Sequence, residues 1–147
     1  MDAQQLVSNL WSALEAQQFG RALDYLASDF QFSGPVPVPL NSLQWIRMHR
    51  ALAAAMPDIS INYVPGGGSY GVVHGSVQLS GTHTATLDLR IPGVPLVCAT
   101  GKRITLPREK VDVAVERGNV IVLQIENLPD GGLMGMLAQM GVALPHA

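Results

Sequence analysis

Apolar side chains recur at helical spacing near the start of the chain. Over residues 3–17 they fall three or four positions apart, at Leu6, Val7, Leu10, Trp11 and Leu14. This spacing predicts a helix with one apolar face. A second, short helix is predicted over residues 19–28. A third is expected to begin at a cap formed by Asn41 or Ser42 and to end near Ala55.

From residue 58 onward apolar and polar positions alternate, which is typical of strands. Strands are predicted over residues 58–63, 73–89, 102–106, 109–116 and 120–125. The long segment 73–89 is expected to bend at Gly81, and the run Pro65-Gly-Gly-Gly is expected to form a turn. Helices followed by antiparallel strands make an α+β domain. No repeat or second domain is visible, so residues 1–147 are predicted to form one domain.

The composition allows a large apolar interior. Of the 147 residues 48% are apolar and 14% are charged, whereas roughly a quarter are charged in an average soluble protein. An oligomer interface and an apolar ligand pocket both explain this bias, and they can coexist. The net charge of −2 comes without a run of Lys or Arg, so the sequence lacks the basic stripe that nucleic-acid binding requires.

Several further classes of protein are disfavoured by the sequence. No stretch approaches the ~18 consecutive apolar residues of a membrane span, and the first residues lack the pattern of a signal peptide. Cys98 is a single cysteine, and the four histidines show no metal-ligand spacing. The sequence also lacks the Gly-x-Ser-x-Gly motif of serine hydrolases. We therefore expect a cytoplasmic protein without a metal or cofactor.

The strand 120–125 ends at a carboxylate, Glu126. Strict alternation puts Val120, Val122, Gln124 and Glu126 on one face of this strand. If that face lines an apolar interior, desolvation raises the pKa of Glu126 and suits it to accept and return a proton. Gln124 is then a candidate substrate contact. The alternative is that Glu126 is an ordinary glutamate in solvent at the end of a strand.

Three other ionisable residues lie on predicted apolar faces. His83 lies on the apolar face of the segment 73–89 and is a candidate to polarise a substrate or to orient the carboxylate, or else a structural histidine. Glu109 shares its strand face with Val111 and Val113 and is expected at the rim of a pocket. His49 lies on the apolar face of the third helix and is a weaker candidate, because the neighbouring Arg50 suggests an exposed edge.

Five short segments occur in an order that resembles a known family. They are Met56-Pro57-Asp58, Gly81-Thr82-His83-Thr84, Thr100-Gly101-Lys102, Gly118-Asn119-Val120 and Leu137-Ala138-Gln139-Met140-Gly141. Together they make the chain similar to the SnoaL-like polyketide cyclases of the NTF2-like superfamily. The similarity covers almost the whole chain.

This resemblance implies a cone in which three N-terminal helices pack on a strongly curved antiparallel sheet and enclose an apolar cavity. It also implies a homodimer and a cavity carboxylate that moves a proton on a carbonyl-bearing substrate. Glu126 lies one residue beyond the family's position for this acid, where the chain has Ile125, and Asp130 is a candidate for the second family acid. Val113 stands on an inner face that is often polar in the family.

Tyr25 and Trp45 are candidate contacts for a small hydrophobic molecule, although their periodic spacing also fits packing in the core.

Three functions remain open. The first is an enzyme that cyclises or isomerises an apolar carbonyl compound, with Glu126 as base and His83 and Gln124 as its helpers. The second is a non-catalytic protein that binds a hydrophobic small molecule in the same cavity. The third is a dimeric interaction protein with a dry, packed interior, which a cavity below ~300 Å³ favours.

Overall fold

The computed structural model describes residues 2–91 and 93–142. Within these residues, four helices and seven strands follow one another in the order α1 (Ala3–Glu15), α2 (Phe19–Asp24), β1 (Leu26–Ser33), α3 (Ser42–Ala55), β2 (Val64–Ser69), β3 (Val72–Val77), β4 (Ser80–Thr82), β5 (Arg103–Thr105), β6 (Glu109–Glu116), β7 (Asn119–Ile125) and α4 (Gly132–Gln139). The order of helices and strands confirms the predicted α+β class.

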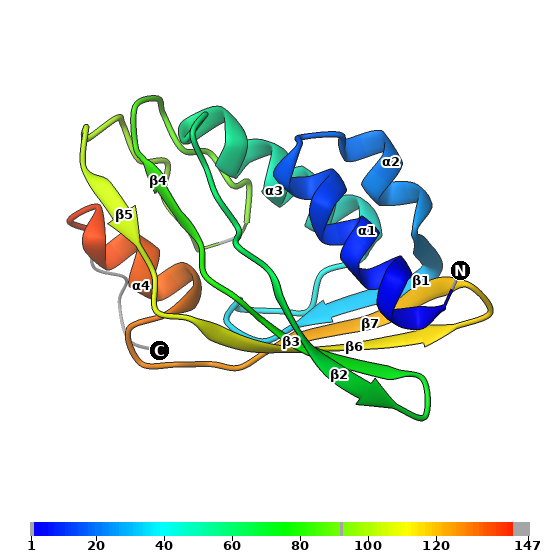
Figure 1. Cartoon of the computed structure of the whole chain (residues 1–147). Coiled ribbons are helices and arrows are strands. Elements are labelled where there is room, and N and C mark those ends of the chain that lie inside the picture. The colour runs from blue at the N-terminus through cyan, green and yellow to red at the C-terminus, as the bar shows by residue number, and fades with distance from the viewer. Residues whose placement is uncertain (1, 92, 143–147) are drawn as a thin grey trace.

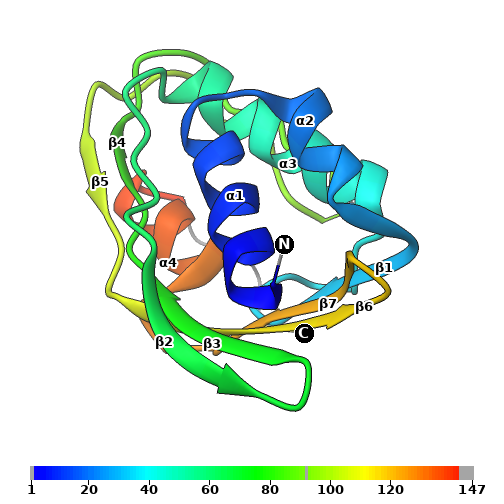
Figure 2. The ribbon, with the colours of Figure 1, turned by 45° about the vertical axis from the view of Figure 1, so that its right-hand side comes forward.

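The sheet has five strands in the order β1-β7-β6-β3-β2, and β4 and β5 form a separate antiparallel pair. All neighbouring strands are antiparallel except β1 and β7, which run parallel. Helices α1, α2 and α3 cover one face of the five-stranded sheet, and α4 lies beside β5 at the other end of the molecule (Figure 1). The sheet curves around α1 without closing on itself (Figure 2).

Helix caps place the first and third helices where the sequence predicts them. The side chain of Asp2 accepts a hydrogen bond from the Gln5 backbone N–H at the start of α1. At the start of α3, Asn41 and Gln44 each accept a hydrogen bond from the other's backbone N–H. Such reciprocal bonds satisfy N–H groups that have no partner within the helix.

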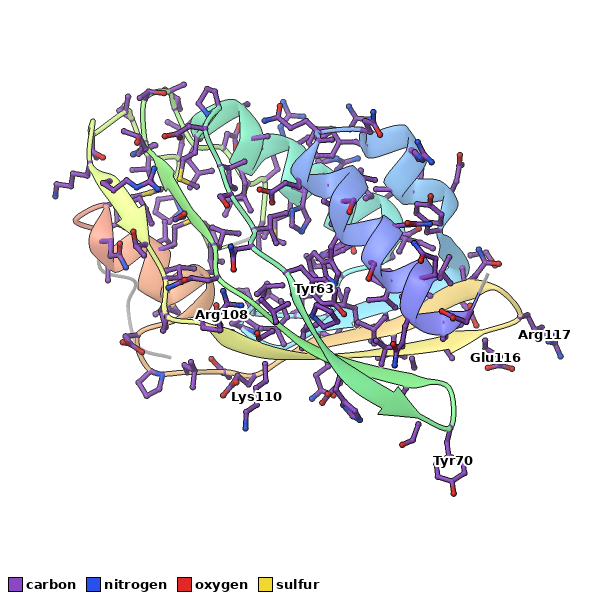
Figure 3. All side chains as sticks on the ribbon, in the orientation of Figure 1. Tyr63, Tyr70, Arg108, Lys110, Glu116 and Arg117 are labelled. Carbon is purple, nitrogen blue, oxygen red and sulfur yellow. The ribbon has the colours of Figure 1, made fainter. Side chains whose placement is uncertain are left out.

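The β-rich middle of the chain differs from its prediction in two places. Pro65 to Gly68 belong to strand β2, and the turn lies at Tyr70 and Gly71, which both have positive φ. Since β2 is at the edge of the sheet, it tolerates a proline and several glycines. Figure 3 shows Tyr70 pointing into solvent from this hairpin.

The predicted long strand 73–89 is also divided. Strand β3 ends at Val77, β4 covers three residues, and between β4 and β5 the described residues form one isolated bridge, from Leu87 to Val97. The segment 58–63 forms a single bridge, from Ser60 to Ser80, instead of the predicted strand.

The buried apolar residues form two clusters. We call the first the sheet cluster; it joins α1 and α3 to β1, β3, β6 and β7 and includes Trp45, Val111, Val113, Val120 and Leu123. The second, the α4 cluster, joins the end of α3 to β5, α4 and the segment 83–102 and includes Met56, Leu87, Ile104 and Leu137. Within the described residues, no helix is long and apolar enough to cross a membrane.

Candidate functional site

An apolar cavity lies at the junction of the two clusters and has a volume of about 80 Å³. The sheet cluster contributes Trp11, Phe32, Trp45, Ile61 and Val77 to its walls, and the α4 cluster contributes Leu52, Leu89, Leu106, Leu133 and Met136. Its two ionisable wall residues are Glu109 and His49. This volume is below the ~300 Å³ expected of a typical ligand site, so in this conformation the cavity accepts only a few heavy atoms.

Glu109 enters the cavity because it begins strand β6, whose alternate residues face inward. Glu109, Val111 and Val113 are buried, whereas Lys110 and Asp112 are exposed. Figure 3 shows Lys110 projecting from the face of the sheet opposite the helices. Glu109 is only 4% exposed, and its Oε2 atom has no hydrogen-bond partner among the described residues.

Burial in apolar surroundings raises the pKa of Glu109, and the negative charges of Glu126 and Asp130 raise it further. The backbone N–H of Gly132 acts in the opposite direction, because it stabilises the ionised carboxylate. A buried carboxyl group with a raised pKa can exchange a proton closer to neutral pH than an exposed glutamate can.

His49 lies on the buried face of α3, one turn after Trp45, and burial lowers its pKa from 6.5 to about 4. Its imidazole is therefore neutral at pH 7 and offers one N–H donor and one acceptor. The ring of His49 meets the Trp45 ring edge to face, with 4.7 Å between centroids. The exposed Arg50 beside His49 misled the sequence interpretation, although His49 shares its helical face with Trp45, Met48 and Leu52.

The cavity also contacts both tryptophans of the chain. Trp11 comes from α1 and Trp45 from α3, and their ring centroids lie 6.1 Å apart. The indole Nε1–H of each is buried and has no hydrogen-bond partner in the part of the chain that the structure describes. Trp45 was a predicted substrate contact and does lie in the cavity wall; the sequence placed Trp11 on the apolar face of its helix without a role in a site.

The sequence predicted that Val122, Gln124 and Glu126 share the inner face of β7, and this prediction is wrong. Opposite β7, Ala114 pairs with Val122 and Val115 pairs with Val120, which leaves Ile121 as an extra residue. This bulge reverses the alternation beyond it. Leu123 is buried and Ile125 lines the cavity, whereas Val122 and Gln124 are exposed.

Glu126 consequently lies outside the cavity wall. It is half-buried, and its carboxylate accepts a hydrogen bond from the backbone N–H of Lys110. Asp130 is exposed. Both acids act on the cavity through their charge on Glu109, not through contact with the cavity.

His83 is fully buried, as its apolar strand face predicts, but it does not line the cavity. Its Nδ1 lies 2.9 Å from Thr100 Oγ1 and 3.3 Å from the Thr100 backbone N–H, which donates to it. Nδ1 is thus the acceptor, and the proton lies on Nε2, which has no partner among the described residues. These bonds tie the segment 83–102 together and indicate a structural role.

Two other predicted contacts belong to the sheet cluster alone. Val113 is fully buried there, and Tyr25 packs at its edge, where Arg21 Nε lies 3.4 Å from the Tyr25 hydroxyl. Neither side chain lines the cavity. Within residues 2–91 and 93–142, no group of three His, Cys, Asp or Glu side chains is arranged to hold a metal ion.

Comparison with known proteins gives matches in structure but not in sequence. No protein-family model and no curated protein sequence matches the chain. IdmH, a proposed polyketide cyclase from Streptomyces antibioticus, has a TM-score of 0.71 and 18% identity, with 97% of this chain and 100% of that chain covered. A proposed SnoaL-like polyketide cyclase from Jannaschia has a TM-score of 0.67 and 12% identity, with 84% and 83% covered.

A third similar structure is an LEH-like epoxide hydrolase from Mycobacterium tuberculosis. Its TM-score is 0.65 at 11% identity, over 95% of this chain and 87% of that chain. The predicted resemblance to SnoaL-like proteins is thus confirmed at the level of fold. Since proteins of this fold are named for different activities, the fold does not fix the reaction.

Proposed function

We propose that this chain is a SnoaL-like enzyme that performs acid/base chemistry on a small apolar carbonyl compound, with Glu109 in place of the expected Glu126. The proposed reaction is an isomerisation or an aldol cyclisation that requires no cofactor. The observation that carries the proposal is the buried carboxyl group of Glu109 in an apolar cavity, with its raised pKa. In a wholly packed interior such a group only destabilises the fold, because burying an ionisable side chain is costly.

In this proposal the Glu109 carboxylate removes a proton from the carbon beside the substrate carbonyl. The electron pair of that C–H bond moves toward the carbonyl oxygen, where the neutral His49 imidazole donates a hydrogen bond. In an isomerisation, protonated Glu109 returns the proton to a different carbon. In an aldol cyclisation, the enolate carbon attacks a second carbonyl group and the resulting alkoxide takes the proton.

The cavity favours a compact and neutral substrate. Its volume of about 80 Å³ is roughly half that of an engineered protein cavity of ~150 Å³ that binds benzene. Its walls are mostly apolar, so a charged ligand would lose its water without gaining a partner. A substrate larger than a few heavy atoms requires movement of the wall residues Leu133 and Met136, which lie on α4.

Deuterium exchange of acetone in D₂O tests the role of Glu109 without knowledge of the natural substrate. Proton removal beside the carbonyl replaces hydrogen by deuterium, which NMR records as the loss of the acetone methyl signal. We expect the protein to accelerate this exchange and Glu109→Gln to reduce the acceleration by about 100-fold or more. The matched control is Glu126→Gln, which should retain it. Equal exchange by Glu109→Gln and the wild type contradicts the assignment.

A second candidate function is binding without chemistry in the same cavity, while the small volume of the cavity favours the third function, a dry interior. Because both tryptophans line the cavity, their fluorescence reports its occupancy. Titration with cyclopentanol that changes this fluorescence, together with no acceleration of acetone exchange, supports the binding function. No fluorescence change with any compact alcohol or ketone supports a dry interior.

The homodimer implied by the family resemblance also remains a proposal. Light scattering in solution tests it, with twice the 15.7 kDa mass of the chain expected and the mass of one chain as the contradicting result.

A further inference from the structure

The N-terminal end of α4 lies against the carboxyl group of Glu109. Gly131 is the N-cap residue of this eight-residue helix, has extended backbone angles, and offers no side chain to accept a hydrogen bond. The first backbone N–H groups of a helix have no acceptor within the helix and require one from elsewhere. At most helix starts a polar N-cap side chain provides this acceptor.

Glu109 occupies the space where a side chain of Gly131 would lie. A Cβ atom on Gly131 would be 2.9 Å from Glu109 Oε2 and 3.1 Å from Glu109 Cδ. Residue 132 must be glycine for a different reason. Its φ is +61°, and a Cβ there would lie 2.1 Å from Cβ of Pro35. The two glycines therefore bring α4 close to two separate parts of the cavity wall.

We propose that Gly131 is a positioning residue for Glu109. Its missing side chain lets the Glu109 carboxyl group reach the first backbone N–H of α4 and serve as the cap of this helix. One carboxyl group, carried by a strand distant in sequence, then both fixes the start of α4 and faces the cavity. The closeness of the carboxyl group to Gly131 and its burial are the geometric basis of this proposal; its importance for turnover rests on the proposed function.

The contact with the Gly132 N–H matters because the charged groups around Glu109 oppose its ionisation. The charged groups that act on it are the carboxylates of Glu126, after β7, and Asp130, before α4, and both oppose its ionisation. His49 on α3 is neutral at pH 7. The guanidinium group of the neighbouring Arg108 donates hydrogen bonds to Asn62 and Ser76, not to Glu109. The Gly132 N–H is thus the contact that favours the ionised form.

Loss of this contact should make Glu109 harder to ionise. In Gly131→Ala the new methyl group displaces the carboxyl group from the Gly132 N–H, while burial and the two neighbouring acids remain. The titration midpoint of Glu109 should then rise by about one pH unit. The midpoint is measured by ¹³C NMR of the side-chain carboxyl, and the signal is assigned by its disappearance in Glu109→Gln.

The control is Gly20→Ala, because Gly20 is exposed and a Cβ there meets nothing within 4 Å. This variant should leave the Glu109 midpoint unchanged. An unchanged midpoint in Gly131→Ala overturns the proposal. The Glu109 midpoint is measured without a substrate, so this test is independent of the acetone-exchange test. The proposal on Gly131 can fail while the role of Glu109 holds, and the role of Glu109 can fail while the proposal on Gly131 holds.

A measurement on the wild-type protein makes the test independent of whether Gly131→Ala folds. The amide proton of Gly132 should shift with pH at the same midpoint as the Glu109 carboxyl, because ionisation strengthens the hydrogen bond that it donates. A Gly132 amide signal that does not follow the Glu109 titration overturns the proposal.

Discussion

The two clusters that meet at the cavity are held together in different ways. Around the sheet cluster, β3, β6 and β7 form long ladders, with every residue from Val72 to Val77 paired to β6 and one bulge between β6 and β7. Around the α4 cluster, the strands are three residues long and the segment 83–102 contributes one isolated bridge. The cavity therefore has one wall on a regular sheet and one wall on less regular backbone.

Side chains replace part of the missing ladder in the α4 region. The Gln139 amide accepts a hydrogen bond from the Thr105 backbone N–H at 2.9 Å and donates one to the Thr105 carbonyl at 2.7 Å. Asp58 accepts hydrogen bonds from the Thr82 backbone and hydroxyl and from Arg103. Such local bonds open more easily than a cooperative ladder. The sheet therefore holds Glu109 in a fixed position. We expect a ligand to enter the cavity through the less regular α4 region.

Amide hydrogen exchange should show the largest contrast between the regions. We expect amides in the β6–β7 ladder to exchange at least ~1,000-fold more slowly than those of α4 and the segment 83–102, because the latter open locally. Exchange followed by NMR on the native protein measures this ratio. Similar amide exchange rates in both regions would show that the molecule opens as one unit. The two regions would then not differ in local stability.

The pH dependence of stability tests whether the junction between the regions is dry. The pKa of His49 falls from 6.5 to about 4 on burial, so the folded state resists its protonation. The stability held by neutral His49 is present above pH 6.5 and is lost as pH falls toward 4, by on the order of 3 kcal/mol.

His49→Gln removes this titration. Its free energy of unfolding, from urea titrations at several pH values, should change less between pH 6.5 and 4 than that of the wild type. Identical pH dependence in the two proteins would mean that water reaches the His49 imidazole and that the cavity wall is wet.

Removal of the Gln139 side chain should have the smallest effect and should be confined to one region. Gln139→Ala loses two hydrogen bonds to Thr105, which together stabilise the docking of α4 by about 1–2 kcal/mol. Amides of α4 should therefore exchange about 10-fold faster, with those of β6 and β7 unchanged. Gln124→Ala, on the exposed face of the sheet, is the control. Faster exchange of β6 in Gln139→Ala would contradict local opening.

The sequence predicted the regular region better than the irregular one. Helical spacing and the Asn41 cap located α1 and α3, and alternation from Glu109 to Val113 gave the correct buried face of β6. In the segment 73–89 the same alternation continues after β4, where the described residues form no ladder. There alternate burial comes from packing against the α4 cluster, with His83 and Leu87 buried, so the pattern alone does not distinguish a strand from irregular chain.

The sequence pointed to Glu126 as the base, and to Glu109 only as a rim residue, because one bulge in β7 is not visible in it. The run Val120-Ile121-Val122-Leu123 is apolar at every position, so it does not show where the extra residue lies. Only the pairing of β7 with β6 reveals Ile121 as the bulge and turns Gln124 outward. Glu109 was visible in the sequence as an acid on an apolar face, but its position against the start of α4 depends on segments more than 20 residues apart in the sequence.

The most direct test of the central claim is reaction of the protein with bromoacetone, a compact carbonyl compound with a leaving group. A Glu109 carboxylate oxygen that meets the substrate carbon in the cavity should displace bromide and form an ester, which peptide mass spectrometry locates. The experiment uses Cys98→Ser, since the exposed Cys98 thiol would react first. We predict modification of Glu109, slowed by excess acetone. Modification of Glu126 with Glu109 untouched would contradict the account.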